Sequence, residues 1–522
     1  MREEEFFDIS VKTMRRLLVG IDLGTQSCRS IVFNEVGQMM AYAYKDYPLI
    51  HSKPTWIEQN PEDWWRAVSF TMREALRKEK IHPREIAGIS IATQANTPTP
   101  VDDFGRPRRF AISWLDTRCK PQCSQMAEIL SENRIYQITG QQLMSNFAAP
   151  KLMWIRKNEP EIFRNTKKFL LPEDFILYKL TGKFVTDLSL ASFSLLFDIH
   201  KLKWSEEMLD MVGISSDLLP ELHPSGTVIG EVGEGASKET GLKKGTPVVA
   251  GGHDQCCAAI GAGVVHPGYA LCSTGTACAI MSIQNRPILD PGRRLICYVH
   301  AVPNRWILLG ALSTAGIVLR WFRDEFCSVE VDMANKLGMD PYDILMRKAE
   351  AVEPGAEGVI VLPYFSGAFT PRMNDKARGV IFGLTLHHGK QHLVRALIEA
   401  VAFEIRCNLE VMEELGSSIK EIRLVGGAAK SPLWRQVKAD VTGKPVLSPN
   451  IKEAGSLGAA ILAGVGTGIY RDIDEGVRQA MTISERHEPR EELYERYTCL
   501  YGIYNKVYDS LTEAYDMLAK QY

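Results

Sequence analysis

Apolar and polar residues alternate through residues 16–47 in a way that predicts three short strands joined by tight turns. An apolar run ends at Asp22-Leu23-Gly24-Thr25, a second run follows, and Val36-Gly37 marks a hairpin before the third. Pro61 then opens a helical pattern with an acidic first turn and a basic last turn, as the helix dipole favours. A buried strand that ends in polar residues follows in the segment IAGISIATQ. The pattern predicts a β-meander, a helix and a further strand.

The second half of the chain repeats parts of this pattern. A β-meander is predicted from Gly268, and its Gly275-Thr276 turn echoes Gly24-Thr25 about 250 residues earlier. This spacing is expected of a duplicated domain, although two matching dipeptides also arise by chance. Helical patterns dominate residues 118–180, and a strand leading to Gly426-Gly427, a helix from Pro432 and a small-residue helix follow later. Two large α/β domains are therefore predicted, over residues 16–262 and 263–522, with residues 1–15 as a tail.

Composition narrows the class of protein. The chain has 522 residues, of which 45% are hydrophobic and 24% charged, enough for large cores. A net charge of -2 lacks the basic excess of a dedicated nucleic-acid binder. No apolar run of about 18 residues occurs, and the acidic start differs from a signal peptide, so we expect a soluble, cytoplasmic chain with no membrane contact. The 11 cysteines lack zinc-type spacing and are expected to be free thiols.

The two echoing turns carry the first candidate chemistry. Asp22 combines a carboxylate with the backbone N–H groups and hydroxyls of the Gly24–Ser27 turn, a set that can hold Mg²⁺ and phosphate oxygens. An ordinary hairpin turn is the alternative. The turn at Ser273–Thr276 repeats the donors, and Gly426-Gly427-Ala428 lies between a strand and a helix, where a ligand can approach backbone closely. Neither a P-loop nor a clear dinucleotide fingerprint is present.

Asp254 is the candidate general base. It follows Gly251-Gly252-His253 at the end of an apolar strand, where a carboxylate can accept a hydroxyl proton as that oxygen attacks phosphorus. A helix N-cap is an alternative and compatible role for Asp254. His253 is interpreted as a structural or supporting residue. Cys256 and Cys257 follow directly; inert packing is expected, with oxidative inactivation as the alternative.

Taken together, four segments resemble the FGGY family of carbohydrate kinases in the actin/hexokinase-like superfamily. They are GIDLGTQSCRSIVF, FAAPKLMWIRKN, GGHDQCCAAIGAG and GVIFGLTLHHGKQHLVRALIEA, followed by GGAAKSPLWRQVKADVTGKPV. The resemblance implies two ribonuclease-H-like α/β domains around a deep cleft that closes on ATP, Mg²⁺ and an open-chain sugar or polyol. Domain closure would exclude water and suppress ATP hydrolysis. Family members are often dimers, which leaves a homodimer open.

The resemblance also assigns roles to individual residues. Asp22 matches the Mg²⁺-associated acid and Asp254 the catalytic base. The nucleotide side comprises two phosphate turns, positions beside the nucleotide and an adenosine pocket: Gly24, Thr25, Gln26 and Ser27; Thr274, Gly275 and Thr276; Gly316 and Arg320; Gly427, Ala428 and Ser431. The substrate side comprises Gln94, Ala95, Asn96, Trp114, Asp116, Asn146 and Gln255 together with Asp254.

The substrate subtype follows from one replacement in particular. Gln94-Ala95-Asn96 stands where glycerol kinases have Gln-Arg-Glu, which argues against glycerol. FAAPKLMW looks like the xylulokinase version of its segment, whereas Ser366-Gly367-Ala368-Phe369 and Ala148 depart from that pattern. The resemblance therefore predicts an ATP-dependent kinase for a pentulose such as xylulose. The alternatives are a kinase for another polyol, ketose or sugar acid, including glycerol, erythritol, ribulose and gluconate types, and a nucleotide-dependent chaperone-like module.

Overall fold

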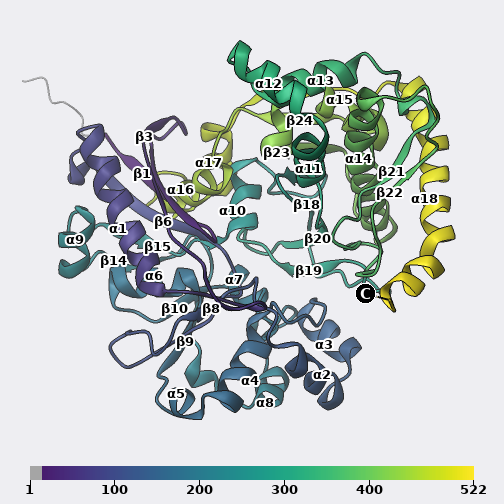
Figure 1. The fold of residues 1–522 in the computed structure, drawn as a ribbon. Helices are drawn as coiled ribbons and strands as arrows, with labels where there is room; N and C mark the ends of the chain where they lie inside the picture. The colour runs from purple at the N-terminus through teal and green to yellow at the C-terminus, as the bar shows by residue number, and fades with distance from the viewer. Residues whose placement is uncertain (1–14, 522) are drawn as a thin grey trace, which may run out of the picture.

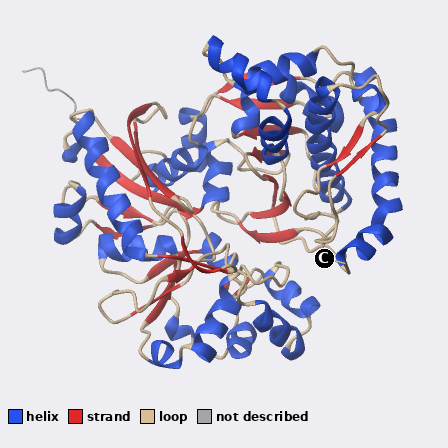
Figure 2. Cartoon of the chain, viewed as in Figure 1, coloured by secondary structure: helices blue, strands red, loops and turns tan. Residues whose placement is uncertain are grey.

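The computed structural model describes residues 15–521 and places a mixed β-sheet in each half of the chain, with helices on both faces (Figures 1 and 2). Strand β1 of the first sheet is antiparallel to β2 and parallel to β6, and β3 continues from β2 as predicted. The sheet runs in the order β14 (Val228–Glu231), β15 (Pro247–Val249), β6 (Ile86–Thr93), β1 (Leu17–Leu23), β2 (Ser27–Phe33) and β3 (Met39–Asp46). The short strand β16 (Gly252–His253) also pairs with β6.

The second sheet repeats the central arrangement of the first. Strand β17 is antiparallel to β18 and parallel to β23, as β1 is to β2 and β6. This sheet runs in the order β19 (Ile296–Val299), β20 (Trp306–Leu312), β18 (Cys278–Gln284), β17 (Tyr269–Thr274), β23 (Glu421–Val425), β24 (Val446–Pro449) and β25 (Ile483–His487). The echo between the two glycine-threonine turns therefore reflects equivalent places in two similar sheets.

The helices form layers outside and between the sheets (Figure 1). Helices α1 (Pro61–Lys78) and α6 (Pro172–Thr181) share a hydrophobic core with the outer face of the first sheet. The far face of the second sheet packs on α11 (Gly316–Phe326), α14 (Lys390–Glu414) and α15 (Pro432–Thr442), and α18 (Glu491–Ala519) packs outside α14 and α15. Between the sheets lie α10 (Asp254–Gly261), α16 (Ala454–Gly466) and α17 (Ile473–Ala480).

Helix α16 comes from the second half of the sequence but packs on the first sheet. A Cβ atom on Gly20 of β1 would lie 1.8 Å from the carbonyl oxygen of Ser456, so only glycine permits this approach. Alternate residues of β1 point to opposite faces, which places Leu18, Gly20 and Asp22 on the side of this helix. The second half of the chain therefore completes the core behind the turn at Gly24–Ser27.

A smaller helical lobe covers the substrate side and has a core of its own. Its helices are α2 (Lys120–Ile129), α3 (Glu132–Thr139), α4 (Ala148–Asn158), α5 (Pro160–Arg164) and α8 (Glu206–Val212). The helical prediction for residues 118–180 holds except at β9 (Lys168–Leu170). Further short elements are β4 (Ile50–Lys53), β5 (Trp56–Gln59), β7 (Thr99–Val101), β8 (Ala111–Ile112), β10 (Val185–Asp187), α7 (Leu188–Ser192), β11 (Phe197–Asp198), β12 (Lys203–Trp204), β13 (Glu221–His223), α9 (Glu234–Thr240), α12 (Ser328–Leu337), α13 (Pro341–Glu350), β21 (Ile360–Leu362) and β22 (Val380–Phe382).

All eleven cysteines are unpaired in the structure, and Cys256 and Cys257 are fully buried in α10. Burial raises the pKa of the Cys257 thiol well above its ordinary value.

In residues 15–521, no helix combines the length and apolar character that crossing a membrane requires. The predicted tail, residues 1–15, lies outside the described residues except for Arg15, whose Nε donates to Glu85 Oε1 at 2.9 Å.

Candidate active site

Three strands of the first sheet end at one edge and bring the predicted chemistry together. Leu23 of β1 and His253 of β16 are both paired with Thr93 of β6, so Gly24, Gln94 and Asp254 follow side by side. The backbone N–H of Gln94 donates to the carbonyl of Leu23 at 3.0 Å. The charge of Asp254 raises the pKa of Asp22, which shows that the two carboxylates face a common space.

Asp254 is the first residue of α10 and is shielded by neighbouring side chains. Burial raises its pKa to about 6, although the backbone N–H of Gln255 opposes the shift. His253 Nε2 lies 3.1 Å from Asp254 Oδ1, and burial lowers the His253 pKa to about 4, so this ring is neutral near pH 7. His253 itself occupies the N-cap position, so the N-cap interpretation of Asp254 is wrong. The side chain of Asp254 therefore contacts Gln255 and His253 rather than capping the helix.

Two buried carboxyl groups fix the backbone that carries Asp254. The N–H of His253 donates to Ser189 Oγ at 3.0 Å, and this hydroxyl donates to Asp187 Oδ1 at 2.5 Å. The N–H of Gly251 donates to Glu173 Oε1 at 2.7 Å. Burial and the neighbouring Asp187 raise the Glu173 pKa well above its ordinary value. Two hydrogen bonds therefore hold the backbone just before Asp254.

Asp22 has the surroundings expected of a cation-binding carboxylate. Burial raises its pKa to about 6, and Arg29 Nη1, which donates to Asp22 Oδ2 at 3.0 Å, opposes the shift. Arg29 Nε also lies 3.8 Å from Glu453 Oε2, at the start of α16. The carboxylates of Asp22 and Glu453 thus share the single guanidinium of Arg29, which, with Asp254 nearby, leaves an excess of negative charge. Oxygen ligands with such an excess fit Mg²⁺.

Hydrogen bonds from several elements hold the first predicted phosphate turn, Gly24–Ser27. Gly24 N–H donates to the carbonyl of Ser27 at 2.9 Å, and Tyr47 donates its hydroxyl proton to the carbonyl of Gly24. Trp114 Nε1 donates to Thr25 Oγ1 at 2.9 Å, and Gln59 Nε2 donates to the carbonyl of Thr25. Trp114, predicted on the substrate side, thus connects the substrate lobe with this turn and stays 38% exposed.

The second predicted phosphate turn, Thr274–Thr276, packs closely against two glycines. Gly316 N–H, at the start of α11, donates to the carbonyl of Gly275 at 2.9 Å, and a Cβ on Gly316 would lie 2.4 Å from that oxygen. Gly426 has φ +89°, and its Cβ would lie 2.5 Å from the carbonyl oxygen of Thr274. Cβ positions of Gly275 and Gly427 meet nothing within 4 Å. The structure therefore brings these predicted nucleotide residues together and leaves open space above them.

The outer predicted nucleotide residues lie around these glycines. Arg320 is exposed one turn into α11, and Gln26 is exposed in the first turn. Ala428 is buried, and Ser431 caps α15 by accepting the Trp434 N–H at 3.3 Å.

Three buried amide oxygens on the substrate side have no hydrogen-bond partner within the protein: Gln94 Oε1, Asn146 Oδ1 and Gln255 Oε1. Gln94 Nε2 is already used, because it donates to Gln59 Oε1 at 2.9 Å. Buried polar atoms are almost always satisfied in folded proteins. These three acceptors, two of them on segments that adjoin Asp254, are therefore available to a ligand that donates hydrogen bonds.

Lys151 joins the two segments that carry these acceptors. Its fully buried ammonium donates to the carbonyls of Asn96 at 2.6 Å and Asn146 at 2.7 Å, and burial lowers its pKa to about 7. Asn96 has φ 58°, and its Oδ1 accepts the N–H of Ala148 at 3.0 Å. The buried Ala95 lies between Gln94 and Asn96.

Asp116 is placed differently from its predicted role. It is fully buried, and its Oδ2 accepts the Ile57 N–H at 2.6 Å and Arg118 Nη2 at 2.6 Å. The Arg118 backbone N–H donates to its other oxygen at 2.9 Å. With both oxygens occupied, Asp116 supports the lobe and is not available to a substrate hydroxyl.

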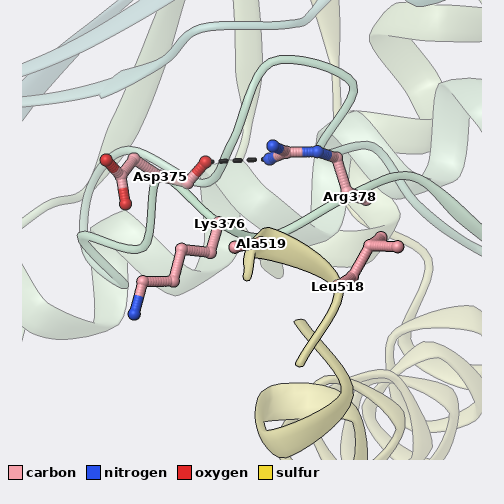
Figure 3. Close-up of a pocket in the computed structure, with 5 residues that line it drawn as sticks. All are labelled: Asp375, Lys376, Arg378, Leu518 and Ala519. Atoms are coloured by element: carbon pink, nitrogen blue, oxygen red, sulfur yellow. Dashed lines mark hydrogen bonds between the residues drawn. The ribbon is translucent and has the colours of Figure 1, made fainter. Parts of the chain in front are cut away.

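A separate surface hollow lies between the segment before β22 and the end of α18 (Figure 3). It is lined by Asp375, Lys376, Arg378, Leu518 and Ala519, and Arg378 Nη1 donates to the carbonyl of Asp375 at 2.9 Å. None of these residues belongs to the cluster around Asp254.

Comparison with known proteins identifies the family. The model of the N-terminal domain of the FGGY family of carbohydrate kinases matches residues 17–261, and the C-terminal domain model matches residues 270–467. The chain belongs to the FGGY family. It is 32% identical over 493 residues to the xylulose kinase of Bacillus subtilis, covering 94% of this chain and 97% of that one. The gluconokinase of the same organism is 32% identical over 508 residues, covering 97% and 98%.

Solved structures agree with this assignment. The gluconate kinase and the ligand-bound xylulose kinase of Lactobacillus acidophilus each give a TM-score of 0.89 at 25% identity. The matches cover 97% and 96% of this chain and all of each relative. The two-domain actin/hexokinase-like α/β fold and the ATP-dependent sugar phosphotransferase activity predicted from the sequence are both confirmed.

Several residues at this site carried little or no signal in the sequence. Arg29 lies two positions after Ser27, so strand alternation places it on the same face as the turn, and that signal was available. Asp187, Ser189 and Glu173 had none, because they meet the Asp254 segment only through the tertiary fold.

Proposed function

We propose that this FGGY kinase transfers the γ-phosphoryl group of ATP to a terminal hydroxyl of an open-chain pentulose such as xylulose, with Asp254 as general base. The supporting observation is the set of unpartnered acceptors at Gln94, Asn146 and Gln255 beside that carboxylate. Each can accept a hydrogen bond from a sugar hydroxyl. A polyhydroxylated chain bound there would bring its end toward Asp254.

The protein has to position the sugar hydroxyl next to the γ-phosphorus and to balance the charge on the phosphoryl oxygens. As the hydroxyl oxygen bonds to the γ-phosphorus, Asp254 takes the hydroxyl proton and the bond from phosphorus to the ADP oxygen breaks. The Gly24 and Gly275 N–H groups donate to carbonyls within their own turns. The other backbone N–H groups of the turns at residues 24–27 and 274–276 would stabilise charge on the phosphoryl oxygens. Asp22, with Asp254 nearby, would hold Mg²⁺, which supplies positive charge to the β- and γ-phosphates.

A neutral sugar fits the surroundings better than an aldonate, although relatives of both kinds are found. An aldonate carboxylate needs a cation, and the nearby buried cations among residues 15–521 are already used. Lys151 donates to two carbonyls, and Arg118 is paired with Asp116 and Glu58. Binding an anion would break one of these interactions, at a cost of several kcal/mol.

A substrate panel with direct measurement of ADP release tests the proposal. The purified protein is supplied with ATP, Mg²⁺ and, in turn, xylulose, ribulose, erythritol, glycerol and gluconate. We expect the highest kcat/KM with a pentulose and almost no ADP release without sugar. A preference for gluconate would overturn the substrate assignment, and ADP release that no sugar stimulates would favour a chaperone-like module. The Asp254→Asn variant is the control for background hydrolysis.

A further inference from the structure

Lys438 places a buried positive charge beneath the second phosphate turn. It lies in α15 with an exposed fraction of 1%, and its Nζ donates to Thr274 Oγ1 at 3.1 Å. The Trp434 ring centre lies 5.0 Å from the ammonium. Across residues 15–521, no carboxylate forms an ion pair with it within 4.0 Å; the nearest groups of opposing character are the thiols of Cys272 and Cys278, each 3.3 Å from Thr274 Oγ1.

This arrangement gives the ammonium one hydrogen-bond acceptor and, among the described residues, no carboxylate partner. An ammonium group has three donors, and Lys438 uses one on a hydroxyl, whereas the equally buried Lys151 has two carbonyl acceptors. Burial lowers the pKa of Lys438, and the two thiols only partly oppose that shift. Isolated buried charges are strongly destabilising, so they are retained where an anion completes them.

The position of Thr274 indicates which anion that is. Thr274 is the last residue of β17, and the exposed residues Gly275 to Ala277 follow it directly. The turn packs against Gly316 and Gly426, and the space on the other side of Gly275 is open. A charge under Thr274 therefore acts on whatever binds along this turn, and a polyphosphate is the anion that its N–H donors suit.

We propose that Lys438 is a positioning residue for the nucleotide: through Thr274 it holds the second phosphate turn and balances the charge of the bound polyphosphate. The proposal rests on the assignment of this turn under Proposed function. It does not depend on which sugar is phosphorylated or on the role of Asp254.

The direction in which the melting temperature changes distinguishes this role from a purely structural one. Lys438→Met keeps the length of the side chain and removes the buried charge. If Lys438 serves the nucleotide, the variant without ligand melts at a higher temperature than the wild type, while its affinity for nucleotide falls. If Lys438 only supports the fold, the variant melts at a lower temperature and binds nucleotide as before.

The experiment measures both quantities without turnover. Melting temperature is determined by calorimetry without ligand, and the Kd of ADP and of a non-hydrolysable ATP analogue by titration calorimetry without sugar. We expect Kd to rise about tenfold, as the loss of one nearby charge in a partly buried site would produce. A Kd within about twofold of the wild-type value overturns the proposal whatever the melting temperature, because the loss of one nearby charge should weaken binding more than that.

Two further variants keep the test decisive. Thr274→Val has nearly the same shape but breaks the link to the ammonium, so its Kd should rise like that of Lys438→Met even if the latter folds poorly. Cys272→Ala removes a neighbouring thiol and keeps the cation, so nucleotide should bind at least as tightly as to the wild type. Weaker binding by Cys272→Ala together with normal binding by Thr274→Val would identify a structural Lys438–thiol pair and refute the proposal.

Discussion

The raised pKa of Asp254 predicts that turnover is lost in mildly acidic solution. A general base must be ionised, and burial stabilises the neutral acid, so the pKa rises to about 6. At pH 5 about one tenth of such a carboxyl group is ionised, and at pH 8 nearly all of it is. An exposed aspartate, with a pKa near 3.9, would still be about nine-tenths ionised at pH 5. We therefore expect kcat to fall about tenfold between pH 8 and pH 5.

The assay is the initial rate of phosphorylated sugar formation at saturating ATP and sugar, measured at intervals from pH 5 to pH 8.5 by direct product analysis. Asp22 also has a pKa raised to about 6, so the acid limb can be steeper than one proton requires. The Asp254→Asn variant separates the two groups: its kcat should be about 10²–10⁴-fold lower, and any remaining acid limb belongs to Asp22. A kcat that stays constant down to pH 5 would refute the assignment of Asp254 as a buried base.

Other predictions concern the groups that position the site. Ser189→Ala removes the partner of the His253 N–H and should lower kcat about tenfold while the KM for ATP is unchanged; a changed KM with normal kcat would argue otherwise. Glu173→Gln keeps an acceptor for the Gly251 N–H and should remain close to wild type in steady-state kinetics, whereas Glu173→Leu removes that acceptor and should lower kcat. Gly316→Ala pushes against the Gly275 carbonyl, so nucleotide titration should show binding weakened about tenfold or more; unchanged affinity would remove this contact from the nucleotide site.

Local pattern predicted the elements that depend on neighbours in sequence. Helix α1 begins at Pro61 as expected, because Asn60 accepts the Glu62 N–H as an N-cap and the acidic first turn suits the helix dipole. The hairpin glycine Gly37 has φ +72°, the backbone conformation that its turn requires. Asp254 lies at the predicted junction of a strand and a helix.

Local sequence patterns could not predict which side chains from distant segments form hydrogen bonds with one another. Asp116 matched a substrate-side position, yet its oxygens are occupied by Ile57 and Arg118. Whether a carboxylate is free or occupied depends on what packs against it, which one strand or helix does not reveal. The same holds for Gln94, whose amide nitrogen is used by Gln59 while its oxygen is left without a partner.

The sequence by itself determined the two meanders, their glycine-threonine turns and a carboxylate after an apolar strand, because strand and helix periods act over a few residues. The tertiary structure alone decided that α16 packs on β1, that Asp187 and Glu173 hold the Asp254 segment, and that Lys438 lies beneath Thr274. These contacts join residues far apart in the chain. They are set by how whole sheets and helices pack, and the same local pattern is compatible with many such packings.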